Sequence, residues 1–256
     1  MIIFDSEMRK AFSLTLAGCL FLASCSNKIT SLKTIARADT AGTISTTIPV
    51  TQHRDKHYDW DKRHQQVLAL NKERPPKVVF IGNSITHYWG GEPVDPLSRG
   101  ADSWDEYFKS KDVRNLGFGW DRIENVLWRV YHGELDGYKA SHITLLMGTN
   151  NLPVSTDEEI ITGLEFLIQA IKRHQPKAKF MLISILPRKN YEQRIMSLNE
   201  RIRQLAGKLN VNYIPAHKLL AIDGGKPNPE LFTADGVHPN TAGYRVLAPL
   251  INSYLN

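Results

Sequence analysis

Short, nearly continuous apolar runs alternate with longer amphipathic segments through most of this chain. The apolar runs lie at residues 77–81, 113–116, 143–147, 180–185 and 211–214. The segments of helix length lie at residues 58–70, 104–109, 122–131, 157–174, 192–209 and 241–254. Strands that are apolar throughout and are separated by helices are typical of a parallel sheet covered on both faces. The pattern therefore predicts one doubly wound α/β domain over residues 53–256.

A secretory signal precedes the predicted domain. Arg9 and Lys10 stand before a 14-residue apolar run from Ala11 to Ser24. A basic start followed by an apolar stretch of this length is typical of a signal peptide, and it is shorter than the ~20 residues that span a bilayer as a helix. We expect residues 1–25 to form this signal, with Met8 as an alternative first residue.

The end of the signal resembles a bacterial lipobox. Leu-Ala-Ser before Cys25 fits that pattern, and cleavage there would leave Cys25 to be acylated. Cys19 fits as well, but cleavage there would leave an apolar stretch on the mature chain; an ordinary signal with a chance cysteine is the other alternative. Residues 26–52, rich in Ser, Thr, Ala and Lys, are expected to form a flexible linker. We therefore expect an exported protein of a Gram-negative bacterium, periplasmic or anchored in the outer membrane through its N-terminal lipid alone.

Composition and charge exclude several classes of function. Of the 256 residues, 42% are hydrophobic and 23% are charged, which is ordinary for a globular protein and too apolar for a disordered chain. Two cysteines cannot build a disulfide framework or a zinc ribbon. Of the net charge of +6, residues 25–76 carry +4 and residues 77–256 only +2. The basic excess thus does not form a patch on the folded body, and we expect no nucleic-acid partner.

Polar and glycine-rich motifs follow the predicted strands. They are Gly82-Asn83-Ser84, Gly117-Phe118-Gly119-Trp120-Asp121, Gly148-Thr149-Asn150 and, before the last helix, Asp235-Gly236-Val237-His238. In doubly wound sheets the site lies at the carboxyl ends of the strands. Each motif alone is weak evidence, but together they supply a nucleophile, a base with an orienting carboxylate, and amide donors. This set predicts a site for serine acyl transfer.

In this order, the four motifs resemble blocks of the SGNH (GDSL-like) hydrolase superfamily. Further stretches resemble the branch of the catalytic subunit of platelet-activating-factor acetylhydrolase: Asn125–Arg129, Gly133-Glu134-Leu135 and Leu186-Pro187-Arg188. The resemblance covers residues 77–254. It implies a flavodoxin-like, three-layer α/β/α sandwich around a five-stranded, mostly parallel sheet, and ester hydrolysis without a metal or another cofactor.

The resemblance implies three catalytic residues. Ser84 is the nucleophile, His238 is the general base that takes its proton, and Asp235 orients the imidazole and stabilises its cationic form. Some members of the superfamily manage with the serine–histidine pair alone. Asn83 replaces the acidic residue of the GDSL name, and we expect it to give a supporting hydrogen bond.

The resemblance also implies three donors for the oxyanion of the tetrahedral intermediate. They are the Ser84 backbone N–H, the N–H of a glycine in the second motif, and the Asn150 side-chain amide. This chain departs from the family, because Trp120 occupies the position of that glycine. A backbone N–H survives any substitution except proline, so either Trp120 donates or Gly119 takes the role, and we favour Trp120. A non-glycine residue is unfavourable there if the position requires a positive φ.

Two other stretches have alternative interpretations. Residues 87–92, His-Tyr-Trp-Gly-Gly-Glu, form either an aromatic wall for a sugar, with Glu92 binding its hydroxyls, or ordinary packing at the sheet edge. Asp121-x-x-Glu124 is typical of a capping box at the start of a helix.

The expected function is that of an envelope-anchored serine esterase that removes a small acyl group, acetyl in the first instance, through an acyl-enzyme. O-acetylated carbohydrate is the expected substrate. One alternative is a lipid acylhydrolase that acts on phospholipid or lysophospholipid. Another is a non-catalytic glycan-binding lipoprotein, against which Ser84, Asn150 and His238 argue.

Overall fold

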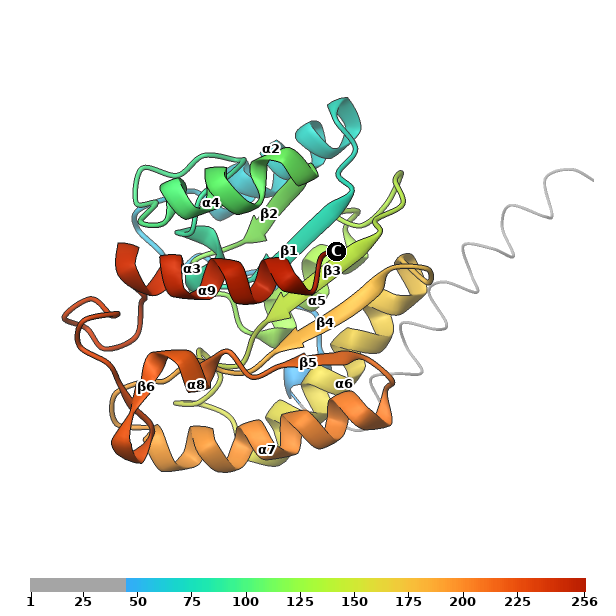
Figure 1. Ribbon diagram of the computed structural model, residues 1–256. Helices are drawn as coiled ribbons and strands as arrows, with labels where there is room; N and C mark the ends of the chain where they lie inside the picture. The colour runs from blue at the N-terminus through green and yellow to red at the C-terminus, as the bar shows by residue number, and fades with distance from the viewer. Residues whose placement is uncertain (1–44) are drawn as a thin grey trace, which may run out of the picture. The chain divides into compact units, whose positions relative to one another are not determined.

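A parallel sheet forms the centre of the computed structural model, which describes residues 45–256 (Figure 1). Its strands are β1 (Val78–Gly82), β2 (Val113–Gly117), β3 (His142–Leu146), β4 (Lys179–Ile183) and β5 (Asn212–Ile214). Their order is β2-β1-β3-β4-β5, and every neighbouring pair is parallel. This is the flavodoxin-like order, so the predicted fold class is confirmed. The predictions for residues 1–44, Cys25 included, lie outside the described residues.

Helices cover both faces of the sheet. One face carries α2 (Trp60–Glu73), α5 (Ile123–Tyr131), α6 (Asp157–His174) and α7 (Glu192–Lys208), and the other carries α3 (Ser84–His87), α4 (Ala101–Tyr107), α8 (His217–Leu220) and α9 (Thr241–Ser253). Alternate strand residues divide between the faces, because successive side chains of a strand point in opposite directions. Val79 and Ile81 belong to the first core cluster, and Val78 and Phe80 to the second. The three-layer sandwich is therefore confirmed.

The sequence pattern found the long elements and missed the short ones. The predicted strands and helices agree with the observed elements to within a few residues. Elements without a sequence signal are the helices α3 and α8, the antiparallel pair β6 (Ala221–Ile222) and β7 (Lys226–Pro227), and the 3₁₀ turns η1 (Ser45–Thr47), η2 (Lys109–Lys111) and η3 (Asp223–Gly225). Among residues 45–256, no helix has the length and apolar character needed to cross a membrane.

The start of α5 differs from the predicted capping box. The helix is capped by Arg122, whose backbone N–H donates to Asn125 Oδ1 at 2.9 Å. Asp121 is fully buried, and its side chain accepts hydrogen bonds from Arg129 Nε and Trp60 Nε1, each at 2.8 Å. Burial raises the pKa of Asp121 to about 6, against the opposing effect of the Arg129 charge. Trp60 of α2 and Arg129 of α5 thus hold this carboxylate in the core, and it does not cap the helix.

The residues before α2 belong to the folded domain. We call residues 45–59 the pre-α2 segment. Thr46 is buried, and its Oγ1 donates to Glu159 O at 2.6 Å. Gln52 is also buried, with its side-chain amide bound inside the domain. The folded domain therefore begins before residue 53 and includes residues that the sequence assigned to the linker, because their polar groups have partners far away in the chain.

Candidate active site

Three of the residues singled out in the sequence meet at the carboxyl ends of the strands. Ser84 begins α3 directly after β1, while His238 and Asp235 lie on the loop before α9. His238 Nε2 lies 2.9 Å from Ser84 Oγ, and His238 Nδ1 lies 2.6 Å from Asp235 Oδ2. The Asp235 contact favours the tautomer with its hydrogen on Nδ1, which leaves Nε2 to accept the serine proton. We call these three residues the triad.

Hydrogen bonds keep the Asp235 carboxylate ionised. Its Oδ1 accepts bonds from the backbone N–H groups of Val237 at 2.8 Å and His238 at 3.0 Å, and from Thr233 Oγ1 at 2.7 Å. Burial raises the pKa of Asp235, but these bonds and the bond from the His238 side chain outweigh it, so the pKa lies well below its usual range. The negative charge of Asp235 is therefore available to stabilise a protonated His238.

A tight turn between strand and helix presents Ser84. A Cβ on Gly82 would lie 2.0 Å from Thr86 Oγ1, so no larger residue fits at the end of β1 without displacing that side chain. Asn83 caps α3, because its side chain accepts the Ile85 N–H at 2.9 Å. Its supporting hydrogen bond is thus confirmed. Ser84 is the first residue of the helix, and its own N–H has no acceptor within α3.

The turn Phe118–Asp121 gives its two central residues different hydrogen bonds. The Asp121 N–H donates to Phe118 O at 3.2 Å and closes the turn. The Gly119 N–H donates to His87 Nδ1 at 3.1 Å and is therefore occupied. Trp120 has a φ of 63°, and its N–H donates to no other residue in the described part of the chain. Its side chain is 54% exposed.

Asn150 reaches the same turn from the end of β3. Its Nδ2 donates one hydrogen to Asp121 O at 2.9 Å, and the second hydrogen of this amide has no partner among residues 45–256. The neighbouring Asn151 is buried and accepts the Ile123 N–H at 3.1 Å. The motif after β3 is therefore attached both to the turn and to the start of α5.

The sequence analysis did not identify the groups that hold the turn in place. His87 is buried, and its Nε2 lies 2.9 Å from Asp95 Oδ2, off the line that a hydrogen bond requires. Burial lowers the pKa of His87 to about 4, so the ring is neutral and can accept the Gly119 N–H. The Gly119 carbonyl accepts bonds from Tyr58 Oη and Gln52 Nε2, each at 2.9 Å. No local motif marks these two residues, which stand 61 and 67 positions away.

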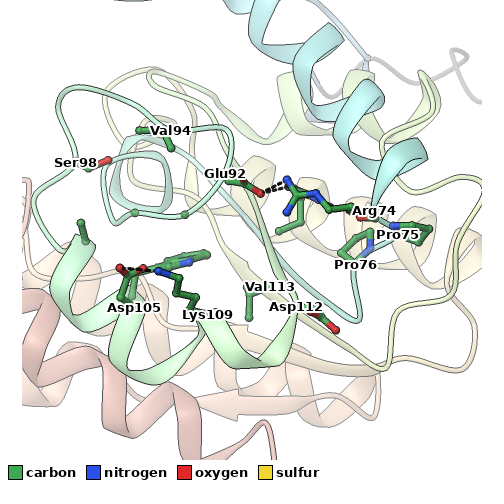
Figure 2. A pocket seen from close by; sticks show the side chains of 15 residues that line it. Arg74, Pro75, Pro76, Glu92, Val94, Ser98, Asp105, Lys109, Asp112 and Val113 are labelled. Carbon is green, nitrogen blue, oxygen red and sulfur yellow. Dashed lines mark hydrogen bonds and ion pairs between the residues drawn. The ribbon is translucent and has the colours of Figure 1, made fainter.

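The aromatic residues of the stretch 87–92 pack inside the domain, as the second of the two interpretations expects. The three aromatic side chains of this stretch are buried. Glu92 Oε2 accepts hydrogen bonds from Arg74 Nη2 at 2.6 Å and Arg114 Nη1 at 3.2 Å. Figure 2 shows the Arg74–Glu92 pair at a cavity of about 480 Å³ beside β2, whose lining includes none of the triad.

Among the described residues, no group of three or more His, Cys, Asp or Glu is placed to hold a metal ion.

Comparisons with known proteins identify the family. Residues 80–246 match the model of the GDSL-like lipase/acylhydrolase family. The chain belongs to this family. Platelet-activating factor acetylhydrolase IB subunit alpha2 of Rattus norvegicus is 32% identical over 166 residues, which cover 65% of this chain and 68% of the relative. Subunit alpha1 of Pongo abelii is 27% identical over 202 residues, which cover 77% of this chain and 82% of the relative. The resemblance inferred from the motifs is therefore confirmed.

Solved structures show the same fold for this GDSL-like acylhydrolase. A GDSL-like lipase from Bacteroides thetaiotaomicron superposes with a TM-score of 0.62 at 22% identity, covering 77% of this chain and 97% of its own. A lipase/acylhydrolase from Enterococcus faecalis superposes with a TM-score of 0.56 at 23% identity, covering 70% and 95%. As a member of this family, the protein is a hydrolase that acts on esters.

Proposed function

We propose that the protein hydrolyses small acyl esters, acetyl esters first, through a covalent acyl-enzyme on Ser84. The observation that carries the proposal is the 2.9 Å distance between Ser84 Oγ and His238 Nε2, with Asp235 Oδ2 2.6 Å from the other ring nitrogen. A base must lie within hydrogen-bond reach of the proton that it removes, and this one does. Ser84 and His238 stand 154 positions apart, so the fold itself creates the contact.

The triad accounts for both halves of the reaction. Ser84 Oγ forms a bond to the acyl carbon while His238 Nε2 takes the hydroxyl proton, and the carbonyl oxygen becomes an oxyanion. The ester C–O bond then breaks, and His238 gives the proton to the leaving alkoxide. Water next attacks the acyl-enzyme and gives a proton to His238, which returns it to Ser84 Oγ as the carboxylic acid leaves. Asp235 stays ionised and stabilises the imidazolium in both halves.

Three hydrogens are proposed to stabilise the oxyanion. They are the Ser84 N–H, the Trp120 N–H and the second hydrogen of Asn150 Nδ2. A donor of this kind contributes about 3 kcal/mol to transition-state stabilisation. Gly119 is not assigned this role, because its N–H is bound to His87 Nδ1.

O-acetylated carbohydrate is the proposed substrate. The names of the relatives, which are acetylhydrolases, support the small acyl group. The signal and lipobox patterns support export and a lipid anchor at Cys25, and glycans are accessible to an enzyme of the cell envelope. The same relatives are named for platelet-activating factor, which favours a lipid acylhydrolase as the second candidate. Both candidates release acetyl, so the alcohol part of the ester separates them: faster hydrolysis of an acetylated lipid than of an acetylated sugar would favour the second candidate.

Labelling with a fluorophosphonate, which reacts with activated serines, tests the proposed function. We expect wild-type protein that lacks residues 1–25 to be labelled and the Ser84→Ala variant to be unlabelled. Ser253→Ala is the matched control, since Ser253 Oγ donates a hydrogen bond to Leu250 O near the end of α9 and lies outside the triad. An unlabelled wild-type protein, or a labelled Ser84→Ala variant, would refute the assignment of the nucleophile.

A further inference from the structure

The peptide that joins Gly119 to Trp120 is held by groups from outside the region that matches the family model. Its carbonyl oxygen, on Gly119, accepts hydrogen bonds from Tyr58 Oη and Gln52 Nε2, each at 2.9 Å. Both donors belong to the pre-α2 segment, whereas the family model matches residues 80–246. The direction of this carbonyl is therefore set by residues that the family motifs do not include.

Peptide geometry extends this anchor to the Trp120 N–H. In a trans peptide the C=O and the following N–H point in opposite directions. Among residues 45–256 the cis bond is the one between Glu92 and Pro93, so the Gly119–Trp120 peptide is trans. Because the Gly119 carbonyl points toward Tyr58 and Gln52, the Trp120 N–H points away from the pre-α2 segment. This is the N–H that we assign to the oxyanion.

A turn of another type over Phe118–Asp121 would direct the Trp120 N–H away from the oxyanion. Type I and type II turns keep the same bond between their first and last residues and differ by roughly half a rotation of the central peptide. In Phe118–Asp121 the central peptide is the one between Gly119 and Trp120. The φ of 63° at Trp120 fits type II, where glycine is favoured at this position. The type I form would relieve the left-handed strain of the tryptophan, but it would turn the N–H away.

The two donors are themselves fixed. The Tyr58 ring packs edge-on against the His87 ring, with centroids 4.7 Å apart. Burial raises the pKa of the Tyr58 hydroxyl, which therefore stays protonated and able to donate. Gln52 Nε2 also donates to Asp121 Oδ1 at 3.1 Å, and Gln52 Oε1 accepts the Arg54 N–H at 2.8 Å. Rotation of the central peptide would leave both donors without the Gly119 carbonyl.

We propose that Tyr58 and Gln52 are positioning residues, which hold the Gly119–Trp120 peptide in the orientation that serves the oxyanion. This proposal rests on the function proposed above. A glycine at position 120 would adopt the required φ without strain, whereas Trp120 needs an external anchor. The pre-α2 segment supplies that anchor and so compensates for the departure of this chain from the family pattern.

Removal of the donors tests the proposal by kinetics. We expect Tyr58→Phe to lower kcat on p-nitrophenyl acetate about tenfold, and Tyr58→Phe with Gln52→Leu about a hundredfold. KM is expected to stay within about twofold, because the oxyanion forms only after the attack. Tyr138→Phe is the matched control, since its hydroxyl donates to another backbone carbonyl, Glu134 O, at 2.8 Å. A kcat for Tyr58→Phe equal to that of wild type, or a rise in KM alone, would overturn the proposal.

A rescue variant separates positioning from a general loss of packing. Addition of Trp120→Gly to the double variant removes the strain that drives the rotation. We expect it to raise kcat roughly tenfold over the double variant, although it adds no contact. Damaged folding would not be repaired by this substitution, so the absence of any rescue counts against the proposal.

A crystal structure of the double variant gives a readout that does not depend on activity. We expect a rotated Gly119–Trp120 peptide with a negative φ at Trp120, and an unchanged positive φ refutes the proposal. The single variant Tyr58→Phe, which loses one hydroxyl, serves the same purpose if the double variant does not fold. Equal activity of Ser84→Ala and wild type in the same assay would refute the proposed function instead, and the crystal structure would still decide the role of Tyr58 and Gln52.

Discussion

Two histidine–aspartate pairs contact the catalytic segments of this acylhydrolase, and they differ mainly in burial. In the pair of His238 with Asp235 the side chains are 23% and 46% exposed, and the second ring nitrogen faces Ser84 Oγ. In the pair of His87 with Asp95 they are 0% and 9% exposed, and the second ring nitrogen accepts the Gly119 N–H of the Phe118–Asp121 turn.

The difference shows that burial, more than residue type, decides what such a pair does. Burial lowers the pKa of His87 to about 4, although Asp95 acts in the opposite direction. The ring is therefore neutral near pH 7 and serves as a fixed acceptor. His238 is partly exposed beside a carboxylate that hydrogen bonds keep ionised, and its Nε2 lies 2.9 Å from Ser84 Oγ, which is the geometry that the proposed proton transfer requires. One pair maintains the structure of the site, and the other is suited to proton transfer.

Removal of the exposed imidazole is expected to have the largest effect. His238→Ala should lower kcat on p-nitrophenyl acetate by roughly a thousandfold or more, because among residues 45–256 the side-chain base at hydrogen-bond distance from Ser84 Oγ is His238. His174→Ala is the matched control, since His174 Nδ1 also lies 2.7 Å from a carboxylate, that of Asp136, and its side chain is 24% exposed. Comparable losses in both variants would mean that His238 acts only through the structure.

Replacement of the buried imidazole should change the pH dependence of stability. The pKa of His87 is about 4 in the folded state and 6.5 as the reference for the unfolded chain. Between these values the unfolded state binds more protons, so the free energy of unfolding falls as the pH falls, by about 3 kcal/mol in total. Asn at position 87 keeps an acceptor but does not titrate. We therefore expect His87→Asn to lack the part of the fall in unfolding free energy that comes from His87.

Urea unfolding at about pH 7 and about pH 4 measures this difference. Asp95, Asp55 and Arg63 also affect the charge at His87, and both proteins retain them. Burial raises the pKa of Asp95 and its contact with His87 lowers it, so the comparison between the two proteins measures the His87–Asp95 pair. An equal fall in unfolding free energy for wild type and variant would show that His87 is not held neutral.

Replacement of the Asp235 carboxylate should have a smaller effect than the replacement of either histidine. Asp235→Asn is expected to lower kcat about thirtyfold, or about 2 kcal/mol, because His238 remains and water can reach the half-exposed position. The loss should be clearly smaller than that of His238→Ala in the same ester assay. Equal losses in the two variants would mean that the orienting role belongs to another group.

Local signals made most of the fold predictable from the sequence. The strands β1 and β3 are buried at every position, and the mostly apolar sequences VVFIG and HITLL indicate this. The amphipathic pattern predicted a helix over residues 157–174, and α6 begins there with a capping box formed by Thr156 and Glu159. The four-residue helix α8 and the two-residue strands β6 and β7 are too short to have a period. Their positions depend on packing against other parts of the chain.

The candidate site was predictable as far as its motifs are contiguous. Ser84 and the Asp235–His238 loop each lie in a short recognisable stretch, and the parallel sheet brings the two together. The sequence favoured Trp120 over Gly119 but left both open, because the choice depends on how α3 packs against the turn. The same holds for Asp121, which has the sequence of a helix cap but is bound by Trp60, 61 positions away, as well as by Arg129 within α5.

The pre-α2 segment also affects how the enzyme should be prepared. A recombinant protein that starts at residue 53 would retain the triad and all of the strands, yet it would lack Gln52 and the buried Thr46. On the role proposed for Gln52, such a protein would hold the Gly119–Trp120 peptide less firmly, and we expect its kcat to be lower than that of the longer chain. Expression should therefore begin upstream of Ser45, well before the first residue of the family match.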